Sequence, residues 1–130
     1  MSDFATALSI SSSGLQAQAA RLRHLSENIS NADTPGYRRK TISFETEMRA
    51  ASDVAGVAPG RVRLDRSELE RIHDPGHPLA DETGHYDGSN VDLLIELADA
   101  REAQRSYEAN LKIFEQTRKM SSGLMELLRR

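Results

Sequence analysis

Apolar residues recur every seven positions at the start of the chain and lie on one stripe of a helix. The repeat consists of Leu8, Leu15, Leu22 and Ile29, with Phe4 and Leu25 on the intervening seam. Because Ser11 and Gln18 interrupt that seam, the stripe is weak. A helix with one apolar stripe must bury it against another element. The pattern predicts an N-terminal amphipathic helix over residues 1–32.

Poor helix formers occupy the middle of this first helix, where residues 11–14 are three serines and a glycine. Each disfavours an isolated helix by a few tenths to about 1 kcal/mol relative to alanine. Most helices gain their stability from packing an apolar face. We therefore expect the first helix to be marginal alone and to depend on a partner.

A stronger apolar pattern covers the C-terminal part of the chain. One heptad position holds Leu93, Ala100, Tyr107, Phe114 and Leu128, its companion holds Leu97, Leu111 and Met125, and a wider row holds Ile113, Met120, Leu124 and Leu127. Glu108 precedes Lys112, and Glu115 precedes Lys119, by four residues. Such pairs add about 0.2–0.5 kcal/mol each to a helix. With Ser89 or Asn90 as its N-cap, a helix is predicted over roughly 90–128, within a C-terminal helical segment 90–130.

Turn-forming residues organise the segment 33–89 between the two helices. Pro35 and Gly36 end the first helix in a predicted type II turn, in which Gly36 is the residue most in need of a positive φ. Residues 37–44 could form a short strand, residues 50–60 are small and flexible, and residues 61–64 alternate in strand fashion. Prolines and a glycine favour an extended turn over 73–81.

The predicted fold is mainly α. Two long terminal helices form a coiled-coil-like antiparallel pair, and an irregular or short-β polar segment lies between them. The apolar stripes can bury each other or those of neighbouring copies. Because only 5% of the residues are aromatic, a large compact core is not expected.

Charge and cysteine content narrow the function. A net charge of -3 gives no general attraction to nucleic acid or anionic membranes, and the absence of cysteine excludes disulfides and thiol chemistry. No apolar run approaches the length of a membrane span, and the N-terminus lacks the pattern of a cleaved secretory signal. We therefore expect no nucleic-acid partner and no membrane-spanning segment, and any export must use another route.

Other candidate sites have simpler interpretations. His73, His77 and His85 lie near aspartates and could bind zinc, but prolines break helical ligand spacing, and a solvated polar loop is favoured. The basic run 38–40 is interpreted as facing solvent or another subunit. Asn28, Asn31 and Asp33 are interpreted as helix-end groups bonding to local backbone. No catalytic motif is present, so we expect neither an enzyme nor a cofactor.

The run 26–37, from Ser26 to Tyr37, resembles the N-terminal signature of bacterial flagellar rod and hook proteins. These proteins carry an Asn-rich helix end followed by a Thr-x-Gly-aromatic turn. Further similar elements are residues 75–81, 90–92 and 105–110, and together they make the chain most similar to a proximal rod protein. The turn 33–37 is also similar to that of the sister proximal rod protein, which stays an alternative. A helical-hairpin adaptor outside the flagellum is a second alternative.

The resemblance implies a structural subunit of the flagellar basal body that self-assembles with other rod proteins into the drive shaft for motility. Implied partners are other copies, neighbouring rod proteins, the ring or adaptor at the base, and the flagellar type III export apparatus. The family signature turn corresponds here to Asn28, Asn31, Thr34, Gly36 and Tyr37. The implied subunit interface is formed by Leu8, Leu15, Leu22, Leu25, Ile29, Leu93, Leu97, Tyr107, Leu111, Phe114, Met125 and Leu128.

Overall fold

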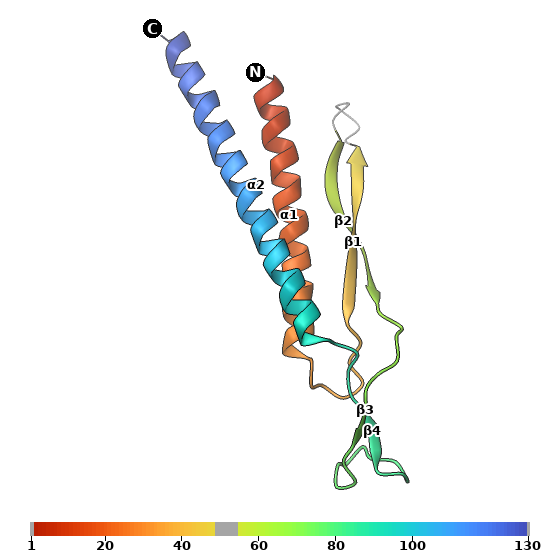
Figure 1. Cartoon of the computed structure of the whole chain (residues 1–130). Coiled ribbons are helices and arrows are strands. Elements are labelled where there is room, and N and C mark those ends of the chain that lie inside the picture. Colours follow the sequence, from red (N-terminus) through yellow and green to blue (C-terminus); the bar gives the residue numbers. More distant parts are fainter. Residues whose placement is uncertain (1, 49–54, 130) are drawn as a thin grey trace.

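The computed structural model describes residues 2–48 and 55–129 and places two long helices side by side (Figure 1). Helix α1 spans Ser2–Ser30 and helix α2 spans Leu93–Leu128. They run antiparallel, and they diverge toward the end of the molecule that carries both termini. The predicted mainly α fold is confirmed, with two long terminal helices and short β structure between them.

Helix α1 lies between α2 on one side and a β-hairpin on the other (Figure 1). The hairpin pairs β1 (Lys40–Met48) with β2 (Ala55–Leu64) in antiparallel fashion, with an irregularity between Ile42 and Phe44. Within the described residues, α2 makes no contact with either strand of this hairpin. One long face of α2 is therefore left without an intramolecular neighbour.

The serine-rich run of α1 is the place where both neighbours come close. Ser11 and Ser13 are buried, and the Ser13 hydroxyl donates to the carbonyl of Ile10 at 2.7 Å. The same hydroxyl accepts from the Val57 amide of β2 at 3.0 Å. A Cβ on Gly14 would lie 3.1 Å from Nδ2 of Asn110. The small side chains of this run weaken the isolated helix, but they also allow α2 and β2 to pack closely against α1.

Asp92 is the N-cap of helix α2, which corrects the predicted cap. The Asp92 carboxylate accepts from the Leu94 amide at 3.0 Å. Ser89 and Asn90 cannot serve because their side chains are used elsewhere. Ser89 donates to the carbonyl of Ala32, and Asn90 accepts from the Arg39 amide. The helix therefore begins three residues later than position 90.

The middle of the chain is more regular than the sequence predicted. The strand expected over 37–44 begins at Lys40, and the one expected over 61–64 is the end of β2. Of the segment 50–60, predicted as small and flexible, residues 50–54 lie outside the described residues. Residues 55–60 belong to β2, so flexibility was the wrong prediction there, because their backbone pairs with β1.

A second, smaller hairpin lies at the end of the molecule opposite the termini (Figure 1). Strand β3 (Arg71–His73) pairs with β4 (His85–Asp87), and the turn predicted over 73–81 lies between them. Asp81 fixes this turn, because its carboxylate accepts from the Thr83 hydroxyl, the His85 amide and Arg71. These bonds hold the pKa of Asp81 well below its usual range.

Few apolar side chains are buried among the described residues, and the two largest fully buried side chains are polar. Ala17, Leu25 and Ala103 form the buried apolar set, whereas Glu96 and Asn28 are the largest side chains with no exposure. Of the 36 residues of α2, only Glu96 and Ala103 are buried. The interior is thus small and polar, and the apolar surface lies outside.

Candidate functional site

Two features of the described chain stand out as functional: an apolar outer face on α2 and a buried polar cluster at its start. The outer face of α2 consists of exposed apolar residues, namely Leu93, Leu94, Ile95, Leu97, Leu111, Ile113, Met120, Leu124, Met125, Leu127 and Leu128. Leu94 is 79% exposed and Leu128 is 73% exposed. Many large apolar side chains exposed on one helix are typical of an interaction surface.

The interface residues predicted on the two helices differ in burial. On α1, Leu25 is buried, whereas Leu8, Leu15, Leu22 and Ile29 are half-buried. On α2, the predicted interface residues fall into two groups by exposure. Tyr107 and Phe114 are half-buried, and the other five, namely Leu93, Leu97, Leu111, Met125 and Leu128, are exposed on the outer face.

The side of α2 that meets α1 carries small and polar residues together with the aromatic residues Tyr107 and Phe114. Buried or half-buried positions on it include Glu96, Ala100, Ala103, Asn110 and Thr117. Their spacing of three or four residues places them on one face of the helix. Tyr107 and Phe114 of the apolar stripe are also half-buried on this side, whereas Leu93, Leu97 and Leu111 of the stripe are exposed.

The signature turn joins the end of α1 to the second hairpin. Asn31 bonds locally as expected, donating to the Glu27 carbonyl at 2.8 Å and accepting from the Thr34 hydroxyl at 3.1 Å. Gly36 has φ of 75°, which confirms the predicted left-handed residue. Its amide donates to the carbonyls of Asp87 and Gly88 at 3.2 and 3.0 Å.

Asn28 has a different role from the one predicted. It is fully buried and bonds to distant residues rather than to its own helix end. Its Nδ2 donates to the Lys40 carbonyl at 2.9 Å and to Glu96 Oε2 at 3.2 Å. Its Oδ1 accepts from the Tyr37 hydroxyl at 2.9 Å and from the Lys40 amide at 2.8 Å. This one amide therefore ties α1, the turn, β1 and α2 together.

Glu96 carries the second half of this cluster. Its side chain has no exposure, and Oε1 accepts from Arg39 Nε at 2.6 Å. Arg39 also lies 3.4 Å from the Asp65 carboxylate. Burial lowers the pKa of Arg39, but its bonds to Glu96 and Asp65 outweigh this and raise the pKa above its ordinary value. A buried carboxylate of this kind is tolerated only when it is paired and hydrogen-bonded.

Asn90 and Tyr37 complete the cluster. Asn90 Oδ1 accepts from the Arg39 amide at 2.7 Å, and its Nδ2 donates to the Asp65 carbonyl at 3.0 Å. Burial raises the pKa of Tyr37, whose hydroxyl donates to Asn28. We call Asn28, Tyr37, Arg39, Asn90 and Glu96 the polar junction. Because its bonds are mutual, the junction fixes how α2 is set against α1.

The basic run 38–40, predicted to face solvent or another subunit, is used in part within the chain. Arg39 is in the polar junction, and Lys40 Nζ lies 2.8 Å from Glu27 Oε2. This bond lowers the pKa of Glu27 and raises that of Lys40. The prediction was wrong for Arg39, whose partner Glu96 is buried, whereas Lys40 still exposes 36% of its side chain.

Sequence reasoning missed Glu96 and Arg39 as members of one cluster. A signal for Glu96 was present: it is the one acid in the run 93–98, which is otherwise apolar. A lone carboxylate inside an apolar helix start is expected to have a buried partner. For Arg39 no signal in the sequence distinguishes it from Arg38.

The histidines considered as metal ligands are instead packed on aromatic rings. His73 and His85 have ring centroids 4.7 Å apart, and His77 stacks on Tyr86 at 3.9 Å. In the described part of the chain, no three His, Cys, Asp or Glu side chains converge on a metal-sized site. Among the helices in residues 2–48 and 55–129, none is long and apolar enough to cross a membrane.

Family comparisons match both ends of the chain. Residues 3–38 match a family described as flagella basal body rod protein, and residues 82–127 match the flagellar basal body rod FlgEFG protein C-terminal family. The first match contains α1 and the signature turn, and the second contains most of α2.

Similar proteins cover nearly the whole chain. The flagellar basal-body rod protein FlgC of Agrobacterium fabrum is 44% identical over 136 aligned residues, covering 99% of this chain and 98% of that protein. FlgC of Salmonella typhimurium is 31% identical, covering 85% and 87%, and FlgC of Bacillus subtilis is 30% identical, covering 92% and 95%. The match is to FlgC, not to the sister proximal rod protein FlgB, and an adaptor outside the flagellum is not supported. The chain belongs to the FlgC family of flagellar basal-body rod proteins.

Proposed function

We propose that this chain, a structural subunit of the proximal rod of the bacterial flagellar basal body, joins the rod through the outer face of α2. The observation that carries the proposal is the exposure of this face in a single copy. A helix that exposes leucine, isoleucine and methionine along its length has surface left to bury. In a rod, neighbouring subunits pack against this face and bury it.

The terminal segments 1–32 and 90–130 form the inner, axial domain in this proposal. Segment 33–89 forms a second part of the subunit, beside this axial domain. Stacked helix pairs of this type need contacts between unlike surfaces, because such contacts propagate into a helical tube instead of closing into a dimer. In this proposal the half-buried interface residues predicted on α1, namely Leu8, Leu15, Leu22 and Ile29, supply the surface that α2 of a neighbour meets.

The interacting proteins follow from the same arrangement. We propose as partners other copies of the chain, the neighbouring rod proteins FlgB and the FlgF and FlgG type, and the ring or adaptor at the base of the rod. The small buried apolar set also fits export by the flagellar type III apparatus without a cleaved signal. A chain that gains stability mainly on assembly unfolds readily for passage through a narrow channel.

The test separates assembly from folding by changing exposed residues. Leu111→Asp and Leu127→Asp each place a charge on the outer face, where Leu127 is 65% exposed. A side chain buried on assembly is worth about 1.5–3 kcal/mol, so either change should block rod assembly and swimming. The assay uses a flagellated bacterium in which the chain is the only copy of this rod subunit.

The matched control is Gln116→Asp, which places the same acid at an exposed polar position on the same helix. It should leave swimming intact, and circular dichroism should show equal helix in all three purified variants. Normal swimming with both leucine variants would contradict the proposal. Loss of swimming with the control as well would show that the acid, and not the lost apolar contact, is responsible.

A further inference from the structure

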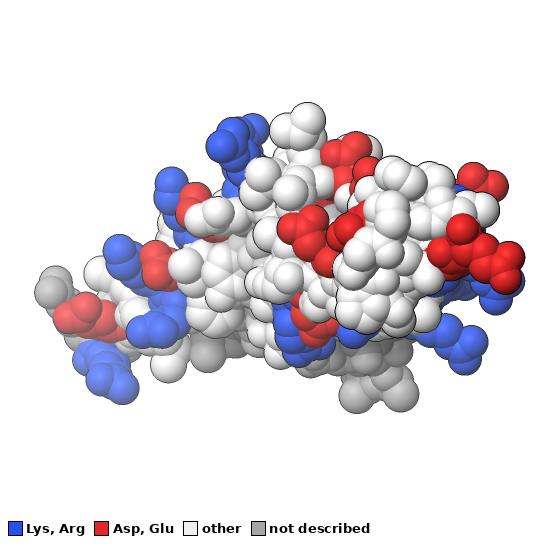
Figure 2. Space-filling model, turned by 90° about the horizontal axis from the view of Figure 1, so that it is seen from below, with Lys and Arg blue, Asp and Glu red and all other residues white. Residues whose placement is uncertain are grey.

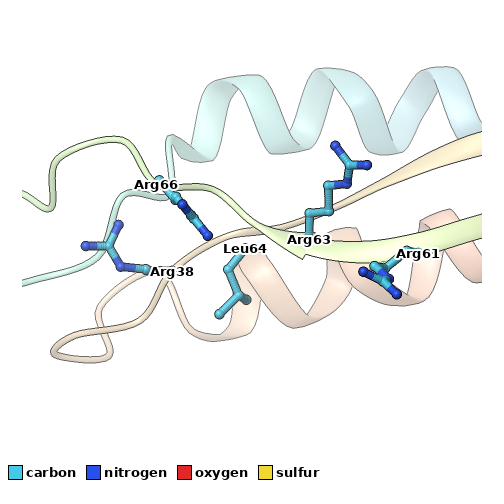
Figure 3. A pocket seen from close by; sticks show the side chains of 5 residues that line it. All are labelled: Arg38, Arg61, Arg63, Leu64 and Arg66. Carbon is cyan, nitrogen blue, oxygen red and sulfur yellow. The ribbon is translucent and has the colours of Figure 1, made fainter.

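Four arginines gather in an open depression beside β2, and the polar junction uses none of them. Arg38, Arg61, Arg63 and Arg66 line it together with Leu64 (Figure 3). Arg38 and Arg66 lie at one end, Arg61 and Arg63 lie further along the hairpin, and Leu64 lies between them. We call these five residues the arginine groove.

The charges of the groove are not neutralised within the described chain. Arg38 Nη1 donates to the backbone carbonyls of Asp65 and Ser67 at 3.2 and 3.0 Å, which holds the side chain but leaves its charge. The ion pairs formed among the described side chains include none of the four arginines. Like charges that line one depression repel each other, so an anionic partner would be attracted to it.

The small hairpin carries the complementary surface. Leu79 is 64% exposed, and its neighbours in the turn include Asp74 and Glu82, both exposed carboxylates. We call residues 74–82 the acidic tip. Figure 2, which looks onto this end of the molecule, shows acidic side chains over it, with lysines and arginines around its border. Asp81 is not counted as free, because it is paired with Arg71 at 2.7 Å.

The arginine groove and the acidic tip are complementary in charge, and each has an exposed leucine. The groove has one exposed leucine, Leu64 at 55%, among four cations, and the tip has one exposed leucine between two anions. We propose that the acidic tip of one copy of this chain docks in the arginine groove of a second copy, with Leu79 against Leu64. This inference rests on the proposed function, because a contact between unlike surfaces of identical chains is the kind that extends an assembly.

Charge reversal followed by charge exchange tests the docking in swimming cells. Arg61→Glu with Arg63→Glu, and separately Asp74→Lys with Glu82→Lys, should each abolish swimming. All four changes together restore the opposite signs across the contact and should recover at least part of the swimming rate. Arg61→Lys with Arg63→Lys keeps the charge and serves as the control. If each double variant swims normally, or the fourfold variant stays immotile while all variants retain parental circular dichroism, the docking is wrong.

Cross-linking identifies the occupant. The chain has no cysteine, so Leu64→Cys with Leu79→Cys provides the only thiols. In isolated basal bodies, a short bismaleimide should give dimers and higher multiples of this chain, and neither single variant should do so. A cross-link to a different protein, or no intermolecular product, would overturn the inference. In either case the proposed function would stand as long as Leu111→Asp and Leu127→Asp still block assembly.

Discussion

The polar junction and the outer face of α2 divide the roles of core and surface in an unusual way. Glu96 at the start of α2 and Asn28 of α1 are fully buried and hydrogen-bonded to each other, and Asn28 also bonds to Lys40 of β1. Further along the same helix, large apolar side chains are exposed. Polar groups that bond mutually define one geometry, whereas apolar groups accept any well-fitting cover. The junction therefore sets the shape of the subunit, and in the proposed assembly the outer face supplies the free energy of association.

The polar junction and the outer face also differ in their position along the molecule. The junction lies at the end where α1 and α2 meet, and the helices diverge away from it toward the termini (Figure 1). We expect the junction end to stay ordered in a free subunit and the diverging ends to gain helix on assembly. A buried ionic cluster is a weak source of stability, but it is costly to leave half paired. The strongest changes are therefore expected at the junction.

Asn28→Asp should have the largest effect on the folded subunit. It would put an oxygen where Nδ2 now lies, 3.2 Å from Glu96 Oε2 and 2.9 Å from the Lys40 carbonyl. The unpaired buried charge should cost on the order of 3 kcal/mol of unfolding free energy. Urea denaturation followed by circular dichroism measures it, with Asn31→Asp as the control that loses a local bond.

The same variant has a defined dependence on pH. Burial beside Glu96 raises the pKa of the new carboxyl, so its penalty is present above that pKa and disappears as the pH falls through it. The gap in stability between Asn28→Asp and the parent should therefore narrow as the pH is lowered from neutrality toward the ordinary pKa of an aspartate. A gap that is constant or grows over this range would mean that the position is not enclosed by acceptors.

Glu96→Gln should have an intermediate effect. Glutamine keeps the shape and can still accept from Arg39 Nε, but it removes the charge that faces the guanidinium at 2.6 Å. Hydrogen bonds to charged groups contribute about 1.5–3 kcal/mol, so we expect a loss of about 2 kcal/mol in urea denaturation. Glu96→Leu with Arg39→Met should be less damaging than the sum of its single changes, because neither charge is left alone. Additive losses would show that the two side chains do not act as a pair.

Substitutions at two glycines should have the smallest effects on stability, and these effects should have opposite signs. Gly14→Val pushes a branched side chain toward Asn110, whose Nδ2 would lie 3.1 Å from the first added atom, and should cost about 1–2 kcal/mol. Gly123→Ala meets nothing within 4 Å and should gain about 0.5–1 kcal/mol through helix propensity. Thermal unfolding of the two variants measures both. Equal gains at the two positions would mean that α1 and α2 are not closely packed at Gly14.

The sequence predicted the elements better than it predicted their contacts. Periodicity found both helices, and the Pro35–Gly36 pair located the turn with its positive φ. The sequence assigned the cap of α2 to Ser89 or Asn90. Nothing in the local sequence shows that these two side chains are hydrogen-bonded to Ala32 and Arg39 instead. It treated Asn28 as a local group for the same reason. Hydrogen bonds across 68 residues, such as Asn28 to Glu96, leave no periodic signal.

Packing partners were also beyond the reach of periodicity. A heptad stripe shows which face of a helix is apolar, but not what covers it. In α2, the buried or half-buried residues include Ala103 and Asn110 besides Tyr107 and Phe114 of the stripe, whereas the leucines of the stripe are exposed. A subunit that completes its core with neighbouring copies has the same pattern as one that completes it alone. The exposure of the leucines in the single chain favours the first of these two alternatives.

Maleimide labelling of Leu124→Cys compares the outer face before and after assembly. Leu124 is 43% exposed in the single chain, and the parent sequence has no cysteine to react. If the outer face is the subunit interface, the thiol reacts rapidly in the purified subunit, is protected in isolated basal bodies, and reacts again once these are dissociated. Equal labelling rates in the free subunit and in intact basal bodies would contradict that role for α2.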